Sequence, residues 1–237
     1  MYTKSVPPIF YFVKWRTENM SIKEFKDMIN QQLQESIAQD QETQENKKPA
    51  ISICFTGHRA KKLAGYNRDS YQKLFDTLYE FLYRLVEIYK DFDITFLTGG
   101  AQGFDQLAFW AVEKVKANGY AVKNVVVIPF KGQENPWQDT GLFSKADYNL
   151  MLKKADNYII LNDNATDYTK KYTQRNHFMV DESVAVIGLF NNIEGGTGEC
   201  VSYALEQKKQ KQMTIYQIPY SIVNGSVIPQ PIRDYSE

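Results

Sequence analysis

Short apolar runs alternate with helical stretches between residues 50 and 220, and this alternation constrains the fold more than any other feature. The runs predict strands at 51–55, 94–97, 125–129, 158–161, 184–189 and 213–218. Helical spacing predicts helices at 69–89, 103–117, 144–154, 168–182 and 198–207. Runs such as VVVI and VAVIGLF are apolar throughout, which is typical of parallel strands covered on both faces. The sequence therefore predicts an α/β, Rossmann-like, largely parallel sheet of about six strands with helices on both faces.

The first 48 residues stand apart from this pattern. Residues 21–33 have apolar side chains at helical spacing, and Ser21 with Glu24 matches a capping box. Residues 34–48 are rich in Gln, Glu and Lys, as in a solvated helix or a linker. We therefore expect an N-terminal helical extension and linker over residues 1–48. Its apolar face either packs on the rest of the chain or serves self-association, so a homo-oligomer is one expectation.

Changes in composition also set the other boundaries. The strand and helix pattern predicts one domain over residues 49–220, which is large enough to fold without a metal or a disulfide. Residues 221–237 carry prolines and a glycine and end in polar residues, so we expect an irregular C-terminal tail. The two cysteines, Cys54 and Cys200, do not form a CxxC pattern, and we expect neither a metal site nor a disulfide.

Charge and hydropathy argue against several classes of protein. Lysine plus arginine and aspartate plus glutamate each number 28, so the basic excess of proteins that grip phosphate backbones is missing and nucleic-acid binding is not expected. No apolar run approaches the roughly 20 residues of a membrane helix, so no membrane association is expected. Prolines interrupt the N-terminal apolar stretch where a signal peptide would be continuous. These features predict a cytoplasmic protein.

Three loops follow predicted strands, and such loops open onto one edge of a parallel sheet. The first contains Thr56, Gly57, His58 and Arg59. The glycine permits a tight turn, while the threonine and the arginine can donate to phosphate or ribose oxygens. The alternative is a surface turn in which Arg59 pairs with a helix carboxylate. For His58, a hydrogen-bonded histidine without a catalytic role is favoured over a base.

The second loop leads from a strand into a helix and contains Thr98, Gly99, Gly100, Ala101, Gln102, Gly103, Phe104 and Asp105. Glycines here let the backbone approach an anion, and the helix that follows presents N–H groups and the positive end of its dipole. A phosphate-binding turn is the leading interpretation. The loop is neither the dinucleotide fingerprint nor a P-loop, because no lysine follows the glycines. Asp105 can alternatively cap the helix.

The third loop has a second glycine cluster in front of a helix, and contains Glu194, Gly195, Gly196, Thr197, Gly198 and Glu199. Two anion-compatible turns in one sheet predict a shared site more strongly than either turn alone. The helix that precedes this loop carries Arg175, Asn176, His177 and Asp181. Arg175 can point at the ligand, whereas His177 is again favoured as a hydrogen-bonded histidine.

Together these segments resemble the SLOG superfamily, and its YpsA-like branch most closely. The resemblance rests on six segments in order, at 56–66, 97–108, 128–137, 155–161, 174–192 and 195–204. The superfamily includes the LOG phosphoribohydrolases and the DprA fold. The resemblance implies a Rossmann-like fold that binds a nucleotide or a nucleotide-derived molecule such as ADP-ribose, as a sensor or a sequestering protein.

The resemblance also implies a set of contacts. Gly99, Gly100, Gly103, Gly195, Gly196 and Thr197 would surround a phosphate. Thr56, Arg59, Phe130, Gln133 and Trp137 would help to enclose a ribose or a base. With their neighbours, the candidate ligand-binding residues also include Gly57, His58, Ala101, Gln102, Asp105, Arg175, Asn176, Asp181 and Gly198.

LOG enzymes cleave the N-glycosidic bond of a nucleoside monophosphate with an arginine from an RKxxM helix and a glutamate from PGGxGTxxE. Residues 175–179, RNHFM, are similar to the first motif, with Asn176 in place of lysine. The second motif departs further, because Ser202 stands at the position of the catalytic glutamate. Glu199 lies about one helical turn earlier, and Asp105 and Asp181 are further candidate carboxylates.

These departures order the functional hypotheses. A protein that binds its ligand without cleaving it is favoured, because serine cannot carry the charge of the glutamate. The alternative is an N-glycosidase in which Arg175 and Glu199 are the catalytic residues. A DprA-like single-strand DNA binder is less favoured because the net charge is zero. No cofactor and no metal are expected.

Overall fold

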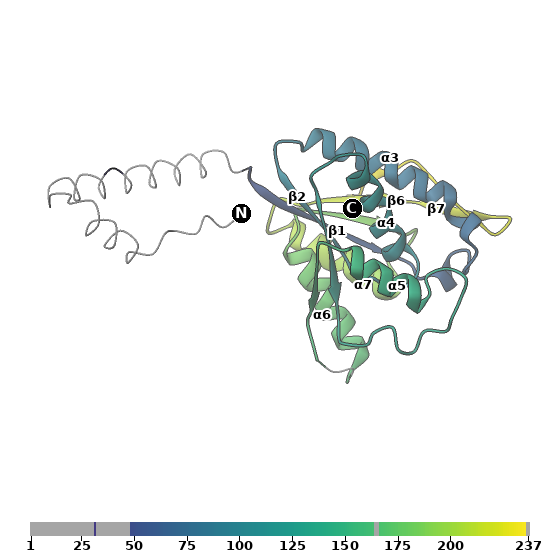
Figure 1. The fold of residues 1–237 in the computed structure, drawn as a ribbon. Helices are drawn as coiled ribbons and strands as arrows, with labels where there is room; N and C mark the ends of the chain where they lie inside the picture. The colour runs from purple at the N-terminus through teal and green to yellow at the C-terminus, as the bar shows by residue number, and fades with distance from the viewer. Residues whose placement is uncertain (1–30, 32–47, 164–165, 236–237) are drawn as a thin grey trace, which may run out of the picture. The chain divides into compact units, whose positions relative to one another are not determined.

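The computed structural model describes residues 31, 48–163 and 166–235 (Figure 1). The predicted helix at 21–33 and the linker that follows it lie outside the described residues, apart from Gln31 and Lys48. The chain divides into two units between Lys48 and Pro49. The fold is therefore that of the second unit.

A seven-stranded sheet forms the centre of this unit. Its strands are β1 (Ala50–Gly57), β2 (Asp93–Thr98), β3 (Lys123–Ile128), β4 (Asn157–Ile160), β5 (Ala185–Leu189), β6 (Thr214–Ile218) and β9 (Arg233–Asp234). They lie in the order β4-β3-β2-β1-β5-β6-β9, and all neighbours are parallel except β6 and β9. The predicted Rossmann-like α/β fold is confirmed, and β1–β6 are the predicted strands.

Helices cover both faces of the sheet, as Figure 1 shows for α3 and α6 on opposite sides. The helices are α3 (Gln72–Ile88), α4 (Phe104–Ala117), α5 (Lys145–Lys154), α6 (Tyr168–Asp181) and α7 (Gly195–Lys208). Side chains alternate along β1, so that Ile53 and Phe55 join one core cluster with α3 and α4, while Cys54 joins another with α6 and α7. Burial on both faces explains why the central strands are apolar throughout.

The helix boundaries follow from capping and spacing. Leu74, Leu78, Leu82 and Leu85 of α3 recur every three or four positions and are buried. The short 3-10 helix η2 (Arg68–Tyr71) leads into α3, so the predicted helix at 69–89 is two elements. In front of α5, Ser144 and Asp147 form a reciprocal capping box.

The residues after β6 form ordered strands where the composition predicts an irregular tail. β7 (Tyr220–Val223) and β8 (Ser226–Pro229) pair as an antiparallel hairpin, and β9 closes the edge of the sheet beside β6. Asn224 and Gly225 connect the hairpin with φ values of 50° and 73°. Asn-Gly between two β-prone runs is a strong hairpin signal, because both residues tolerate a positive φ.

Among the described residues, no helix combines the length and the apolar character needed to cross a bilayer.

Candidate ligand-binding site

The order of the sheet reverses at β1. The chain adds β2, β3 and β4 on one side of β1 and then crosses to add β5 and β6 on the other side. In such sheets ligands bind beyond the carboxyl ends of the strands at the point of reversal. A cavity of about 860 Å³ lies there, lined from the loops after β1 and β5, the turn after β2, the 136–140 segment and α6.

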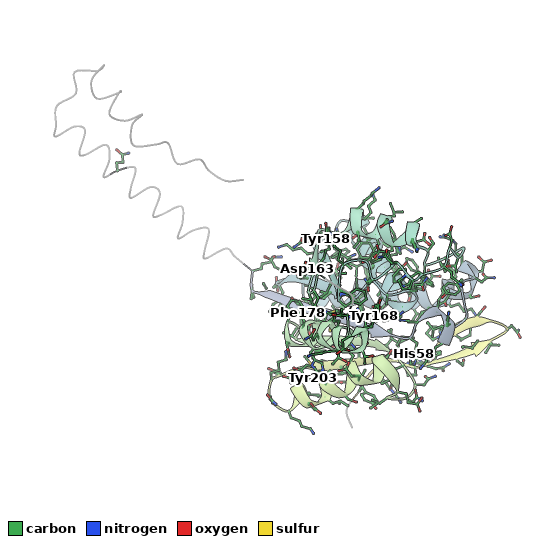
Figure 2. The ribbon with its side chains drawn as sticks, turned by 90° about the horizontal axis from the view of Figure 1, so that it is seen from below. His58, Tyr158, Asp163, Tyr168, Phe178 and Tyr203 are labelled. Carbon is green, nitrogen blue, oxygen red and sulfur yellow. The ribbon has the colours of Figure 1, made fainter. Side chains whose placement is uncertain are left out.

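In Figure 2, Tyr168 at the start of α6 lies nearer to His58 than Phe178 does near the end of the helix. The helix runs back from the carboxyl edge of the sheet, and its residues up to Asn176 border the cavity. Thr169, Tyr172, Thr173, Arg175 and Asn176 all line it.

The cavity brings together most of the candidate residues. Those that line it are Thr56, Gly57, His58, Arg59, Ala101, Gln102, Asp105, Trp137, Arg175, Asn176, Gly195, Gly196, Thr197 and Glu199. Among the described residues, seven candidates do not line it, namely Gly99, Gly100, Gly103, Phe130, Gln133, Asp181 and Gly198. The structure thus separates the loops that face the cavity from residues that support them.

The turn after β2 uses its polar groups internally. Thr98 Oγ1 donates to the Asp105 carbonyl oxygen at 3.0 Å, and the Ala101 N–H donates to Asp105 Oδ2 at 3.3 Å. Gly103 has a φ of 107°, and a Cβ there would lie 2.6 Å from the backbone nitrogen of Ala60. Its glycine therefore serves the packing of two backbones. The turn presents Ala101, Gln102 and Asp105 to the cavity in place of its glycines.

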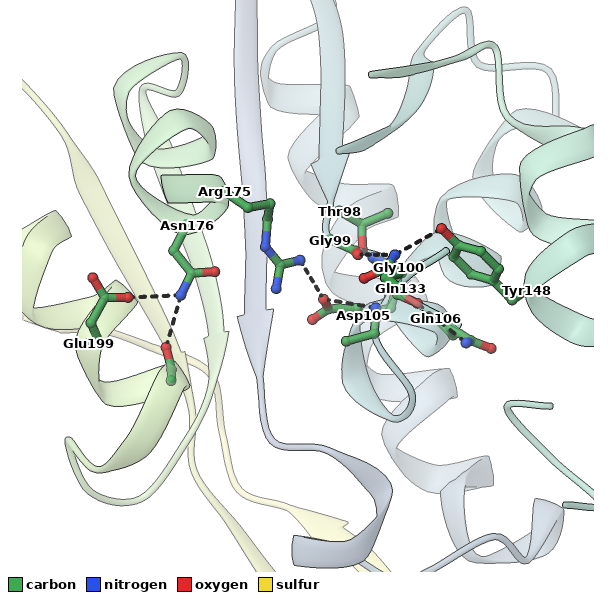
Figure 3. Close-up of polar contacts among 12 residues, drawn as sticks. Thr98, Gly99, Gly100, Asp105, Gln106, Gln133, Tyr148, Arg175, Asn176 and Glu199 are labelled. Atoms are coloured by element: carbon green, nitrogen blue, oxygen red, sulfur yellow. Dashed lines mark hydrogen bonds and ion pairs between the residues drawn. The ribbon is translucent and has the colours of Figure 1, made fainter. Parts of the chain in front are cut away.

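Gly99 has a different role, because the Arg175 guanidinium occupies the space of its missing side chain. A Cβ at Gly99 would lie 0.8 Å from Arg175 Nη1. That nitrogen pairs with Asp105 Oδ2 at 3.2 Å, as Figure 3 shows, and both side chains are less than one-tenth exposed, at 8% and 7%. Burial raises the pKa of Asp105, and the Arg175 charge opposes that rise.

The first turn of α7 is the most exposed anion-compatible feature. Gly195, Gly196 and Thr197 begin the helix, and the leading N–H groups of an α-helix have no partner within it. Space is open around Gly196, where a Cβ would have no neighbour within 4 Å. Lys62 brings a positive charge, since its Nζ lies 3.4 Å from the position of a Gly195 Cβ. The helix dipole and this lysine both favour an anion at the turn.

Glu199 lines the cavity with both carboxylate oxygens already engaged. Asn176 Nδ2 donates to Glu199 Oε2 at 2.8 Å and to the Gly196 carbonyl oxygen at 3.2 Å. His177 Nε2 lies 2.6 Å from Glu199 Oε1, and the imidazole stacks on Tyr203 with 3.7 Å between ring centroids. Tyr203 in turn donates to Asp181 Oδ1 at 2.8 Å, so Asp181 belongs to the α6–α7 contact outside the cavity.

His58 sits on the loop after β1 and faces the start of α7. Its Nδ1 lies 3.4 Å from Thr197 Oγ1, and the residue is buried. Burial lowers the pKa of His58, Lys62 lowers it further, and Glu194 opposes both effects. A lowered pKa favours the neutral imidazole, whose Nδ1 can donate or accept a hydrogen bond at Thr197.

Aromatic side chains form another wall. The Arg59 guanidinium lies over the Tyr172 ring, 5.1 Å from its centroid, and Phe130 packs behind at 5.6 Å from Tyr172. Trp137 lines the cavity and meets Tyr148 edge-on at 5.2 Å. Gln133 is buried and donates to the Gly99 carbonyl oxygen and to the Tyr148 hydroxyl. Phe130 and Gln133 therefore support the wall from behind.

Tyr172 and Lys62 are cavity residues that the sequence interpretation missed. Tyr172 stands three positions before Arg175 on α6 and so shares its helical face, which was a usable signal. Lys62 lies in η1 (Ala60–Lys62), just beyond the first loop. In the described part of the chain, no group of three His, Cys, Asp or Glu side chains is arranged to hold a metal ion.

A sequence model of the YpsA family, described as the YspA SLOG family, matches residues 53–222. The chain belongs to this SLOG family. The match contains all six segments on which the resemblance rests, so the predicted SLOG membership is confirmed.

Two individual proteins are also similar to this SLOG chain. The uncharacterized SPbeta prophage-derived protein YoqJ of Bacillus subtilis (strain 168) is 31% identical over 139 residues, which cover 56% of this chain and 80% of the relative. DNA processing protein A from Helicobacter pylori, solved in work on its single-stranded DNA binding mode, is 16% identical with a TM-score of 0.44. That likeness covers 74% of this chain and 68% of the other.

Proposed function

We propose that this SLOG domain binds a nucleotide or a nucleotide-derived ligand of the ADP-ribose type, as a sensor or a sequestering protein. One observation carries the proposal. The first turn of α7 with Lys62, and the aromatic wall with Tyr172 and Trp137, border the same cavity of about 860 Å³. A ligand with an anionic part and a flat aromatic part satisfies both.

The anionic part of the ligand fits the α7 turn. Its backbone N–H groups are at a helix N-terminus, and Lys62 adds a charge beside Gly195. Arg175 supplies a second cation from α6. Two separate cations suit a diphosphate better than a single phosphate.

The base and ribose fit the opposite wall. Tyr172 and Trp137 offer ring faces and edges to a base, and Arg59 already stacks on Tyr172. Thr56 and Asn176 offer polar groups at the cavity surface. The volume lies toward the upper end of the range for small-molecule pockets, roughly 300–1,000 Å³, and leaves room for more than a nucleoside monophosphate.

Calorimetry against AMP, ADP-ribose and cyclic ADP-ribose derivatives tests the proposal. We expect ADP-ribose to bind and adenosine, which has no phosphate, to bind far more weakly. Gly196→Val fills the space in front of the α7 turn and should abolish binding, whereas Gly141→Val, at another glycine with open surroundings, should not. Absence of binding to every phosphate-bearing probe would sink the proposal.

A second candidate function is cleavage of an N-glycosidic bond, and the carboxylate of Glu199 at the cavity surface favours it. In this reading Glu199 stabilises oxocarbenium-like charge and Arg175 binds the phosphate. Against it, both oxygens of Glu199 are held by Asn176 and His177, and Ser202 stands where LOG enzymes have their glutamate. Chromatography for free base after incubation with AMP decides the matter. The mechanism requires release that Glu199→Gln removes.

A further inference from the structure

Arg175 and Asp105 form an ion pair at the cavity in which the guanidinium does not use all of its hydrogen-bond donors. Only Nη1 of the guanidinium reaches Asp105, at 3.2 Å, and both residues line the cavity. Arg175 Nε is buried and has no hydrogen-bond partner among the described residues. Figure 3 shows the guanidinium reaching from α6 toward the 98–105 turn, while Asn176 points the other way toward Glu199. The pair with Asp105 therefore leaves part of the donor capacity of the guanidinium unused.

Asp105 stands where the anion of a ligand would compete with it. Its carboxylate is buried at the edge of the cavity, and its other hydrogen bond comes from the Ala101 N–H. The charged or titratable groups that face it are Arg175 from α6 and, farther away, Arg59 from the loop after β1. The remaining titratable groups of the cavity are His58, Lys61, Lys62, Tyr66, Tyr172, Glu194 and Glu199.

A phosphate that reaches Arg175 brings a second negative charge beside this carboxylate. Two anions close together in a buried site repel strongly, and protonation of one of them relieves the repulsion. The carboxylate is the group that takes up the proton, because a phosphodiester stays ionised near neutral pH. Burial already raises the pKa of Asp105, so this carboxylate takes up a proton at a higher pH than an exposed carboxylate does.

We propose that Asp105 is a specificity-determining residue, which balances the charge of Arg175 before a ligand binds and takes up one proton from solvent when a ligand phosphate replaces it there. The inference rests on the proposed function. It predicts that a neutral nucleoside leaves the Arg175–Asp105 ion pair intact and that Arg175 does not increase its affinity. It also predicts the direction of the pH effect: because binding takes up a proton, affinity rises as pH falls, by up to about tenfold per pH unit.

Calorimetry with ADP-ribose on the full chain tests this directly. The two phosphates of ADP-ribose form a diester and do not titrate between about pH 6 and about pH 8, unlike a terminal phosphate with its second pKa near 6. Titrations in buffers of different ionisation enthalpy then measure proton uptake by the protein. We expect about one proton per ADP-ribose where Asp105 is ionised before binding. Binding without proton uptake overturns the inference and leaves the proposed function standing.

The variant Asp105→Asn tests whether Asp105 is the residue that takes up the proton. The amide oxygen can still accept from Ala101 and Arg175, so ADP-ribose should bind with no proton uptake and with an affinity that does not depend on pH. Asp139→Asn is the matched control, since it removes an exposed carboxylate that does not line the cavity and should leave the uptake unchanged. Uptake that persists in Asp105→Asn contradicts the assignment to this residue.

The outcomes separate the two proposals. If Asp105→Asn loses its native circular dichroism, the wild-type measurement of proton uptake still decides for or against the inference. If the wild-type chain binds none of ADP-ribose, AMP and inorganic pyrophosphate at any pH, the proposed function fails, and this inference fails with it.

Discussion

The side-chain amide of Asn176 donates to the Gly196 carbonyl oxygen at 3.2 Å, so α6 holds the first turn of α7 in place. The same amide holds Glu199 at 2.8 Å. A neutral amide can bridge a carbonyl and a carboxylate without adding a charge. A residue of the neighbouring helix thus helps to hold the geometry of the proposed anion site.

Asn176→Ala should therefore weaken ADP-ribose binding by about tenfold, because the loss of both hydrogen bonds frees the α7 turn. The free energy of unfolding should fall by about 1 kcal/mol. Calorimetry and urea denaturation measure the two effects. Thr169→Ala, at another α6 residue of the lining, is the control and should change stability little. Unchanged binding in Asn176→Ala would mean that the turn is held by other contacts.

Gly99→Ala should displace the Arg175 guanidinium, because the new methyl group would overlap Nη1. Overpacking of this kind costs about 1–3 kcal/mol of the free energy of unfolding. We expect that loss in urea denaturation, together with weaker ADP-ribose binding. Gly141→Ala has open surroundings and should match the wild type. Wild-type stability and affinity in Gly99→Ala would show that Arg175 moves freely.

Lys62→Met should reduce ADP-ribose affinity by about tenfold at low ionic strength, because it removes the charge beside the α7 turn while keeping an apolar chain of similar length. The difference from the wild type should shrink as salt is added, since salt screens exposed charges. Lys209→Met removes an exposed lysine beyond the end of α7 and serves as the control. A salt-independent difference would contradict an electrostatic role.

His58 should make the stability of the chain depend on pH. Its pKa is lowered by burial, so the unfolded chain binds more protons than the folded chain in the range just below the ordinary value of 6.5. Stability should therefore rise with pH through that range, and His58→Gln should remove this part of the rise. Thermal melts across the range compare the variant with Gln138→Ala, a cavity-lining change without a titratable group. Identical slopes in the two variants would refute the assignment.

Lys211 is a stability residue away from the cavity. Its Nζ donates to the carbonyl oxygens of Val180, Asp181 and Ser183 at 3.0, 2.7 and 3.1 Å, which caps the end of α6. Lys211→Met should cost about 1–3 kcal/mol in urea denaturation, with no change in ADP-ribose affinity per folded molecule. Lys208→Met, which loses only a 3.9 Å ion pair to Asp234, should cost much less. Equal losses would mean that the cap does not stabilise α6.

The sequence predicts β1–β6 and the helices between them because apolar runs and helical spacing are local signals. It also predicts that the loops after β1 and β5 meet, because parallel strands share one carboxyl edge. The hairpin at 220–229 departs from the irregular tail that the nearby prolines and the polar end predict, although Asn224 and Gly225 are a strong turn signal.

The detailed roles of the glycines could not be predicted in the same way. Gly99 and Gly103 look like phosphate-binding glycines in the sequence. In the structure, the absence of a side chain at Gly99 makes room for Arg175, and its absence at Gly103 makes room for the backbone of Ala60. Such contacts depend on the folded arrangement of separate elements. The engagement of Glu199 by His177 and Asn176 is hidden from the sequence for the same reason.

Tyr172, Arg175 and Asn176 lie close together along α6, where Tyr172 contacts Arg59, Arg175 pairs with Asp105, and Asn176 holds the α7 turn. A rigid helix cannot satisfy three partners independently, so a shift that improves one contact disturbs the others. During divergence, a replacement at one of these positions should be tolerated only with compensating replacements at the other two or at their partners. We therefore expect SLOG relatives of this chain to exchange them as a set.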